Sequence, residues 1–402
     1  MKIEMKNPLV EIDGDEMTRI IWAVIKERLL EPFVDLKLER YDLSLEERDR
    51  TDDAVTLEAA KAIEKHGVGV KCATITPDGA SVKQFGLKKA WPSPNGTIRA
   101  YLDGTVFRKA ILVKNVPPAV RSWKKPITIG RHAYGDMFKN GEMLIPGPGR
   151  LEMTYFPSDG TPVKTLNLGE VTEPTLVTTH QNIESSIRSF ARACITVALA
   201  DGIDLWFGCK DTISKTYHGR FREIFSAEVG ARKADFEAAG LNCVTDLLID
   251  DAVARSMRHE GGILWACMNY EGDLMSDMVG SGFGSLGMMT SVLVSPTGQY
   301  EFEAAHGTVT RHYKRHLEGE KTSTNPGATL FAWTGGLAKR GELDGTPELA
   351  RFARAVEDSM IETIESGIVT GDLVASTVPR VEEAASLDTF IGAVEERLRA
   401  KL

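Results

Sequence analysis

Residues 8–30 read PLVEIDGDEMTRIIWAVIKERLL, and this stretch decides the fold class. Its first five residues, Pro8 to Ile12, form an apolar run that is typical of a buried strand. Apolar residues then recur every three or four positions from Met17 to Ile25, which is the period of a helix. A strand followed directly by a helix is the repeating unit of layered α/β proteins, so the stretch predicts an α/β fold.

The same alternation continues along most of the chain, with one exception. Residues 136–182 contain the turn-forming sequences PGPGR at 146–150 and PSDG at 157–160 between short β-like runs, so they predict a small β-rich insert. The other predicted elements are strands over 33–41, 69–74, 204–208 and 291–295, helices over 15–30, 56–66 (ending at Gly67), 183–201, 251–257 and 274–280, and mostly helix from 328 to the end.

Length and charge exclude several classes of protein. A chain of 402 residues is long enough for two or three domains. Its net charge of −9 gives no global support for binding nucleic acid, and no run of about twenty apolar residues predicts a membrane span. The five cysteines form no CxxC pair, and the first ten residues lack the apolar core of a signal peptide. We therefore expect a reducing compartment and a cytoplasmic location.

Three arginines follow a loop rich in Pro and Gly. Ser93 and Asn95 are expected on this loop, where their side chains can face a pocket. Arg99, Arg108 and Arg131 each lie among apolar or small residues, and a buried guanidinium needs an anionic partner. One such arginine is more often part of a structural ion pair. Three beside a polar loop favour a site for a polycarboxylate, because guanidinium forks match carboxylates.

Acidic residues form a second group. Asp250 ends an apolar run, and Asp273 and Asp277 lie four apart, so on a helix they would share one face. No Lys or Arg occurs between 260 and 311 to compensate them. Mg²⁺ or Mn²⁺ would do so, because hard cations prefer carboxylate oxygens. The alternative is a solvated helix face.

Two further segments carry weaker signals. Lys210 follows the strand-like run 204–208 and would be able to transfer protons if its pKa were depressed. Residues 303–312, EAAHGTVTRH, combine a small turn with Arg311 and His312, where a ribose 2′-phosphate would find positive charge. The alternative for both is ordinary surface charge. GFGSLG at 282–287 fits GxGxxG but follows a helical pattern, which argues against a Rossmann site, and His312 and His316 lack the HExxH glutamate of a zinc site.

Taken in order, these sequence motifs resemble one family. SPNGTIR (93–99), GRHAYGD (130–136), YEGDLMSD (270–277), GFGSLGMMTS (282–291) and AAHGTVTRH (304–312) look like the homodimeric NADP-dependent isocitrate dehydrogenases, in the subgroup found in eukaryotes and some bacteria. The resemblance runs from VEIDGDEMTRIIW at 10–22 to TGDL at 370–373.

The resemblance implies an isocitrate/isopropylmalate dehydrogenase-like α/β fold, distinct from the Rossmann fold, in a homodimer with shared active sites. It has a large and a small α/β domain and a β-rich clasp. The implied boundaries are 1–102 and 282–402 for the large domain, 103–135 and 183–281 for the small domain, and 136–182 for the clasp.

The resemblance also implies roles for individual residues. Isocitrate would contact Thr76, Ser93, Asn95, Arg99, Arg108 and Arg131, with Lys210 of the partner subunit as a catalytic group. The metal would be held by Asp273, with Asp277 beside it, and by Asp250 of the partner subunit. NADP would contact Lys71, Thr74, Thr76, Asn95, His306, Gly307, Thr308, Val309, Arg311, His312 and Asn325, with Arg255 of the partner subunit and Arg258 of the partner subunit near the 2′-phosphate.

Two positions depart from the family pattern. Phe138 stands where relatives have a tyrosine that is taken as a proton donor, and phenylalanine cannot donate a proton. Water or Tyr134 would then have to act in its place. Ser81 stands where relatives often have an arginine near the cofactor phosphates.

The expected activity is the oxidative decarboxylation of isocitrate to 2-oxoglutarate and CO₂, a tricarboxylic acid cycle reaction, with reduction of NADP and with Mg²⁺ or Mn²⁺. One alternative is a related dehydrogenase acting on an isopropylmalate- or homoisocitrate-like acid. The Ser93/Asn95 segment with three arginines favours the tri-anion, since an apolar substituent would need an apolar loop. The other alternative is a non-redox protein that binds metal and tricarboxylates.

Overall fold

A computed structural model describes residues 2–402, and the chain separates into two compact units. One unit comprises residues up to Tyr134 together with Glu184–Leu402, and the other is Gly135–Ile183. We describe each unit by itself.

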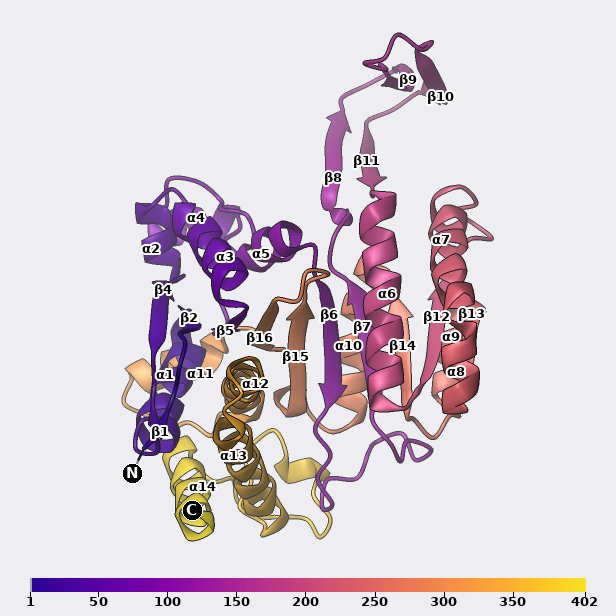
Figure 1. Cartoon of the computed structure of the whole chain (residues 1–402). Helices are drawn as coiled ribbons and strands as arrows, with labels where there is room; N and C mark the ends of the chain where they lie inside the picture. The colour runs from indigo at the N-terminus through magenta and orange to yellow at the C-terminus, as the bar shows by residue number, and fades with distance from the viewer. Residues whose placement is uncertain (1) are drawn as a thin grey trace. The chain divides into compact units, whose positions relative to one another are not determined.

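The larger unit is built on one mixed sheet of ten strands, in the order β13-β12-β14-β7-β6-β15-β16-β5-β2-β4 (Figure 1). Four parallel strands at each end flank β6 and β15, which are antiparallel to their neighbours. The strands of this unit, including the separate pair β1 and β3, are β1 (Ile3–Glu4), β2 (Leu9–Asp13), β3 (Val34–Asp35), β4 (Leu38–Asp42), β5 (Val68–Lys71), β6 (Thr105–Ala110), β7 (Ile127–His132), β12 (Asp204–Cys209), β13 (Cys243–Leu248), β14 (Ile263–Cys267), β15 (Met289–Val294) and β16 (Tyr300–Ala304).

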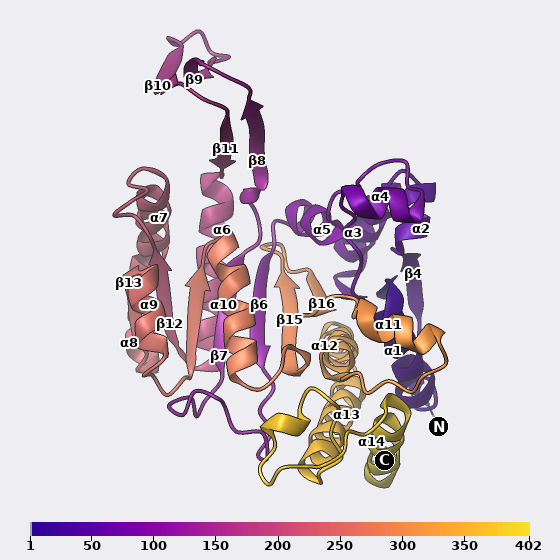
Figure 2. The ribbon, with the colours of Figure 1, turned by 180° about the vertical axis from the view of Figure 1, so that it is seen from behind.

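Helices cover both faces of this sheet. Figures 1 and 2 show α6 on one face of β7 and α10 on the other. The helices are α1 (Glu16–Ile25, continued by a π-helical turn over Lys26–Leu30), α2 (Leu45–Arg50), α3 (Ala54–His66), α4 (Gly79–Phe85), α5 (Pro94–Leu102), α6 (Glu184–Asp201), α7 (Tyr217–Ala231), α8 (Lys233–Ala239), α9 (Ile249–Ser256), α10 (Asn269–Gly282), α11 (Thr310–Leu317), α12 (Gly327–Asp344), α13 (Pro347–Glu365) and α14 (Leu387–Lys401), with 3₁₀ turns at Leu286–Met288 and Val374–Ser376.

The main core lies where α12 and α13 pack against the sheet and α1. The rings of Trp22 and Trp333 lie 4.4 Å apart between their centroids, and both side chains are buried. A Cβ atom at Gly336 would lie 2.1 Å from a methyl group of Val70, so only glycine allows α12 to approach β5 this closely. Packing of this density fixes the strands, and the strands position the polar side chains described below.

The smaller unit consists of two antiparallel ribbons. β8 (Asp136–Ile145) pairs with β11 (Thr175–Gln181), and β9 (Gly149–Tyr155) pairs with β10 (Lys164–Val171). Most side chains here are exposed, including Leu144, Phe156 and Leu176. A two-stranded ribbon is at best marginally stable alone, so these apolar side chains favour packing against another surface.

The α/β fold class is confirmed, and most of the predicted elements are present. Gly67 ends α3 in the left-handed conformation, as its position predicted. The predicted strand over 69–74 was too long, because β5 ends at Lys71 and the chain turns away to form the site. The helix predicted over 274–280 is longer, Asn269–Gly282, because its N-terminal turn packs on β7 and β14.

All five cysteines are free thiols, which confirms that no disulfide framework is present. Within residues 2–402, no helix combines the length and the apolar character that crossing a bilayer requires.

Leu337 tests the main core. Its side chain is fully buried on α12, so Leu337→Ala should lower the free energy of unfolding by about 2–5 kcal/mol. Leu343 lies on the same helix with 46% of its surface exposed, and Leu343→Ala should change the free energy by less than about 1 kcal/mol. Urea unfolding followed by circular dichroism measures both, and equal losses would contradict this account of the core.

Candidate functional site

A row of polar side chains crosses the centre of the ten-stranded sheet. Arg108 of β6 pairs in register with Ser291 of β15, Ser291 with Glu303 of β16, and Glu303 with Lys71 of β5. Residues paired in register point to the same face of a sheet, so these four side chains form one row. All four are buried. Such a row inside an otherwise apolar fold is expensive to maintain unless it serves a site.

The three predicted arginines converge beside this row. Arg99 of α5 donates to Oε1 of Glu303 at 2.6 Å, and Arg108 donates to Oγ of Ser276 at 2.9 Å. Arg131, at the end of β7, donates to Asp273 and, through Nε, to Oδ1 of Asn269 at 3.0 Å. The three arginines are not scattered, because their acidic partners belong to one cluster.

The acidic side chains come from one face of α10. Asp273 and Asp277 lie one turn apart, as predicted, and Nη1 of Arg108 lies 3.9 Å from Asp273 and 3.5 Å from Asp277. The expectation that no nearby cation compensates these carboxylates was wrong. Arg108 and Arg131 are distant in sequence, and the sheet brings them under α10.

Ser93 and Asn95 are placed differently from the prediction. They do not lie together on a loop, because Ser93 is the N-cap of α5 and Asn95 is in its first turn. Oγ of Ser93 accepts the amide of Gly96 at 3.4 Å, and Pro94 occupies the first helical position, where its missing N–H is harmless. The serine and proline that suggested a loop are thus a helix start, and α5 presents Asn95 and Arg99 from one rigid element.

The electrostatics of the cluster favour an anionic ligand. Burial, and then the nearby charge of Arg99, lower the pKa of Arg131 to about 9, although Asp273 opposes this shift. The Nε atoms of Arg99 and Arg108 are buried without a hydrogen-bond acceptor. A carboxylate of a ligand would supply the missing acceptors and the missing negative charge.

The carboxylates suit a divalent cation only in part. Burial and the charge of Asp273 raise the pKa of Asp277, although Arg108 opposes this, so the pair would gain from an added cation. Within residues 2–402 of one chain, no three His, Cys, Asp or Glu side chains are grouped closely enough to hold a metal ion. The oxygen donors of Asp273 and Asp277 therefore fit Mg²⁺ or Mn²⁺ as part of a set that needs further ligands.

Lys210 and Asp250 form a separate pair. Nζ of Lys210 lies 2.6 Å from Oδ1 of Asp250, and this contact lowers the pKa of Asp250. The two residues follow the neighbouring strands β12 and β13, where Cys209 and Leu248 pair in register. Within one chain Lys210 pairs with Asp250, whereas Asp273 pairs with Arg108 and Arg131.

Apart from Asn95, Arg255 and Arg258, the predicted cofactor residues lie in three groups. Lys71 donates from Nζ to the carbonyl of Cys72 at 2.9 Å and to Thr74 at 3.2 Å, and Thr76 follows on the exposed loop. His306, Gly307, Thr308 and Val309 link β16 to α11, which carries Arg311 and His312. Asn325 precedes α12 and donates to Asp372 at 2.9 Å.

Local details of these groups fit a polar ligand. Nε2 of His306 and Oδ1 of Asn95 are buried without a hydrogen-bond partner. Val309 has a φ of 59°, a strained value for a β-branched residue, which strained sites tolerate when the surroundings enforce it. Buried polar atoms without a partner and a strained backbone are features of sites that bind a polar ligand.

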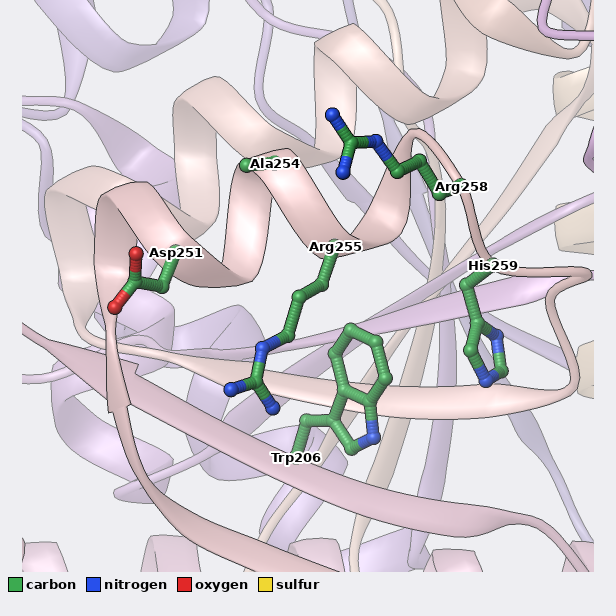
Figure 3. Close-up of a pocket in the computed structure, with 6 residues that line it drawn as sticks. All are labelled: Trp206, Asp251, Ala254, Arg255, Arg258 and His259. Carbon is green, nitrogen blue, oxygen red and sulfur yellow. The ribbon is translucent and has the colours of Figure 1, made fainter.

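Arg255 and Arg258 lie in a pocket of their own. It has a volume of about 510 Å³ and is lined by Trp206, Asp251, Ala254, Arg255, Arg258 and His259 (Figure 3). Arg255 points toward the indole of Trp206, whereas Arg258 points away from it (Figure 3). Two guanidinium groups, an imidazole and one carboxylate around a hollow suit a phosphate.

Tyr134 and Phe138 fall in different units. The ring of Tyr134 lies 6.4 Å from that of His132, and its carbonyl accepts from Asn269 at 3.5 Å. Phe138 is on β8 of the smaller unit. Neither proton-donor prediction is tested by this geometry.

Several side chains that shape the site were missed in the sequence. Glu303 binds Arg99, Asn269 and Ser276 bind the other two arginines, and Glu16 accepts from Thr308 and Thr310. Two signals were available. Glu301 and Glu303 alternate with Tyr300, Phe302 and Ala304, and Asn269 and Ser276 stand four before and three after Asp273, a spacing that places them on one face of α10.

Comparisons with known proteins cover nearly the whole chain. The model of the isocitrate/isopropylmalate dehydrogenase family matches residues 4–394. Two similar proteins are named mitochondrial NADP isocitrate dehydrogenase. The one from Aspergillus niger is 52% identical, and the match covers 100% of this chain and 81% of the relative. The one from Saccharomyces cerevisiae is 49% identical, and the match covers 100% of this chain and 95% of the relative. An NADP isocitrate dehydrogenase from Sphingobium yanoikuyae is 49% identical, covering 100% and 98%.

Glu301 gives a test of the electrostatics. Burial and the charge of Glu303 raise the pKa of this carboxyl to about 7, so the folded state holds a proton that the unfolded chain releases above its ordinary value of 4.5. This contribution to stability is complete below pH 4.5 and is lost as the pH rises through 7.

Glu301→Gln should therefore flatten the decline of stability between pH 5 and 8, measured by urea unfolding at each pH. Burial lowers the pKa of His132 to about 3, so this residue gives stability the opposite dependence on pH. Its contribution is the same in both proteins and cancels when the two stability curves are subtracted. Parallel curves for the two proteins would show that Glu301 is ionised in the folded state throughout.

Proposed function

The chain belongs to the isocitrate/isopropylmalate dehydrogenase family, and from this premise we propose that it oxidises and decarboxylates isocitrate to 2-oxoglutarate and CO₂ while reducing NADP. The observation that carries the proposal is the convergence of Arg99, Arg108 and Arg131 on one carboxylate cluster. Three buried guanidinium groups match a substrate with three carboxylates.

The same observation separates isocitrate from isopropylmalate-like acids. An isopropylmalate-like acid replaces one carboxylate arm by an apolar group, which would leave a buried guanidinium without its anion. The side chains of Ser93 and Asn95 at the start of α5 are polar as well. Turnover on isocitrate, isopropylmalate and homoisocitrate, measured side by side, tests this preference.

The chain's own residues would bind, orient and move protons in this reaction. Arg99, Arg108 and Arg131 would hold the substrate carboxylates and so align its C2–H bond with the cofactor. Asp273, with Asp277 beside it, and Asp250 of the partner subunit would hold Mg²⁺ or Mn²⁺, which would supply a positive charge beside the reacting oxygen. When bound, NADP would supply the hydride acceptor. Lys210 of the partner subunit or Asp250 of the partner subunit would take the proton of the substrate hydroxyl as the hydride leaves.

A proton must also return to C3 after CO₂ is lost, because the product has one C–H bond there in place of the broken C–C bond. Phe138 cannot supply it. Tyr134, in the larger unit with the arginines, or a water molecule would have to act instead.

The proposal includes a homodimer with shared sites. Within one chain Lys210 pairs with Asp250, and Arg255 and Arg258 line a pocket whose lining includes none of the three arginines. The proposed arrangement has the partner subunit supply these four positions. Exposed apolar side chains of the smaller unit, such as Leu144, Phe156 and Leu176, support its role as a clasp between subunits. The division of the larger unit into large and small domains remains part of this proposal.

Two further points belong to the proposal. The pocket with Arg255 and Arg258 of the partner subunit would receive the 2′-phosphate and favour NADP over NAD. Ser81 would then be near the cofactor phosphates without the arginine that relatives often have at its position. A cytoplasmic location fits the five free thiols, whereas the relatives from Aspergillus niger and Saccharomyces cerevisiae are named mitochondrial.

The activity is tested directly by the absorbance of NADPH formed from isocitrate and NADP with Mg²⁺ or Mn²⁺. We expect turnover that stops with EDTA and returns with either metal. A folded protein that shows no signal at any pH, yet binds citrate and metal without NADP in thermal-shift assays, would support the non-redox alternative.

Arg131→His should lower kcat/KM for isocitrate at least tenfold, because it removes a charge-assisted contact worth about 1.5–3 kcal/mol. Arg351→His, at an exposed position paired with Glu348, is the control and should retain full activity. The same NADPH assay measures both, and an unchanged kcat/KM for the Arg131 variant would count against a substrate contact at this side chain.

Phe138→Tyr tests the missing proton donor. Restoring the hydroxyl should raise kcat about tenfold and reduce the solvent isotope effect, because a positioned acid speeds proton return. Phe156→Tyr, at an exposed position of the same unit, should change neither quantity. An unchanged or lower kcat for the Phe138 variant would show that this step does not need the hydroxyl or does not limit turnover.

A further inference from the structure

Arg48 is a fully buried arginine that no step of the proposed reaction uses. It lies on α2, and its exposed fraction is 0%. Its guanidinium donates from Nε to Oδ1 of Asp53 at 2.9 Å, from Nη1 to the carbonyl of Ile75 at 2.9 Å and from Nη2 to the carbonyl of Pro92 at 2.6 Å. Ion pairing alone would need only Asp53, so the two carbonyl contacts require another explanation.

The two carbonyls mark the ends of one surface segment, residues 75–92. Its middle is α4, in which no residue is buried. Thr76, which is proposed to contact substrate and cofactor, follows Ile75 directly. Ser93, the N-cap of α5, follows Pro92 directly. One guanidinium therefore fixes the distance between two parts of the proposed site that are 17 residues apart in sequence.

Two neighbouring carboxylates complete this attachment. Asp15 accepts the amide of Ile75 at 2.8 Å and that of Leu45, the first residue of α2, at 2.9 Å. Asp49 accepts the amide of Lys88 at 2.9 Å and the indole N–H of Trp91 at 2.7 Å. The N–H and the carbonyl of Ile75 are thus both hydrogen-bonded. The other end of the segment is held through the amide of Lys88, the indole of Trp91 and the carbonyl of Pro92.

We propose that Arg48 is a positioning residue, which joins both ends of residues 75–92 so that Thr76 and the N-terminus of α5 face the ligands together. α5 carries Asn95 and Arg99, so a shift of its first turn moves a guanidinium that binds substrate. The identity of these ligands rests on the proposed function, whereas the attachment of the segment does not.

Arg48→Lys is the central variant. An ammonium retains the charge beside Asp53 but cannot reach two carbonyls with the geometry of a guanidinium. We expect the KM for isocitrate to rise about tenfold while kcat changes less than threefold. We also expect trypsin to cleave faster after Lys83, Lys88 and Lys89, all in the segment. Lys88→Met, which removes only the exposed pair with Asp52, should leave KM at the wild-type value.

Asp49→Ala supplies a second variant, because it loosens only the far end and removes no buried charge. It should raise KM and speed cleavage after Lys89 in the same direction, by a smaller factor. Asp53→Asn should lower the midpoint of thermal unfolding with little effect on KM, since it leaves both carbonyl contacts in place.

The results separate this inference from the proposed function. If the wild-type protein did not turn over isocitrate, the proposed function would be contradicted. The trypsin cleavage rates would still test whether Arg48 holds residues 75–92. Folded Arg48→Lys and Asp49→Ala variants with wild-type KM and wild-type cleavage rates would overturn the positioning role, and so would a KM change in Asp53→Asn equal to that in Arg48→Lys.

Discussion

Buried guanidinium groups that must be neutralised are the constraint on which this structure depends. Arg99, Arg108 and Arg131 lie at the junction of β6, β7 and α5, and none would be stable there without a carboxylate. Glu303 pairs with Arg99. Asp273 and Asp277 pair with Arg108, and Asp273 also pairs with Arg131. The register of the central antiparallel strands brings these partners together. The charge pairs therefore depend on the strand pairing, and the pairs in turn stabilise that pairing.

Binding of substrate and metal to this arrangement would be an exchange of partners. The aspartates that neutralise Arg108 and Arg131 in the free chain are the ones proposed to hold the metal. When substrate and metal arrive together, the substrate carboxylates would take over the arginines, and the cation would take over the aspartates. Neither charge is then left buried and unpaired at any stage. The same coupling explains why substrate and cation would bind best as a pair.

The sequence predicted the elements better than their partners. Periodicity gave the α/β class and α3 with its Gly67 cap, and dense turn residues gave the β-rich insert over 136–182, where the structure has the separate unit Gly135–Ile183. It placed Asp273 and Asp277 on one helix face, but it missed their arginine partners, because Arg108 and Arg131 are more than 140 residues away and only strand pairing brings them close. Ser93 and Pro94 suggested a loop because the same residues start helices and turns. The row formed with Lys71, Ser291 and Glu303 depends on register, which no local pattern encodes.

The most direct measurement is a crystal structure with NADP, isocitrate and Ca²⁺, a cation that supports catalysis poorly. The account predicts substrate carboxylates on Arg99, Arg108 and Arg131, and the cation bound between Asp273 and Asp250 of the partner subunit. Isocitrate bound elsewhere, with Arg131 still paired to Asp273 and no cation on α10, would contradict it.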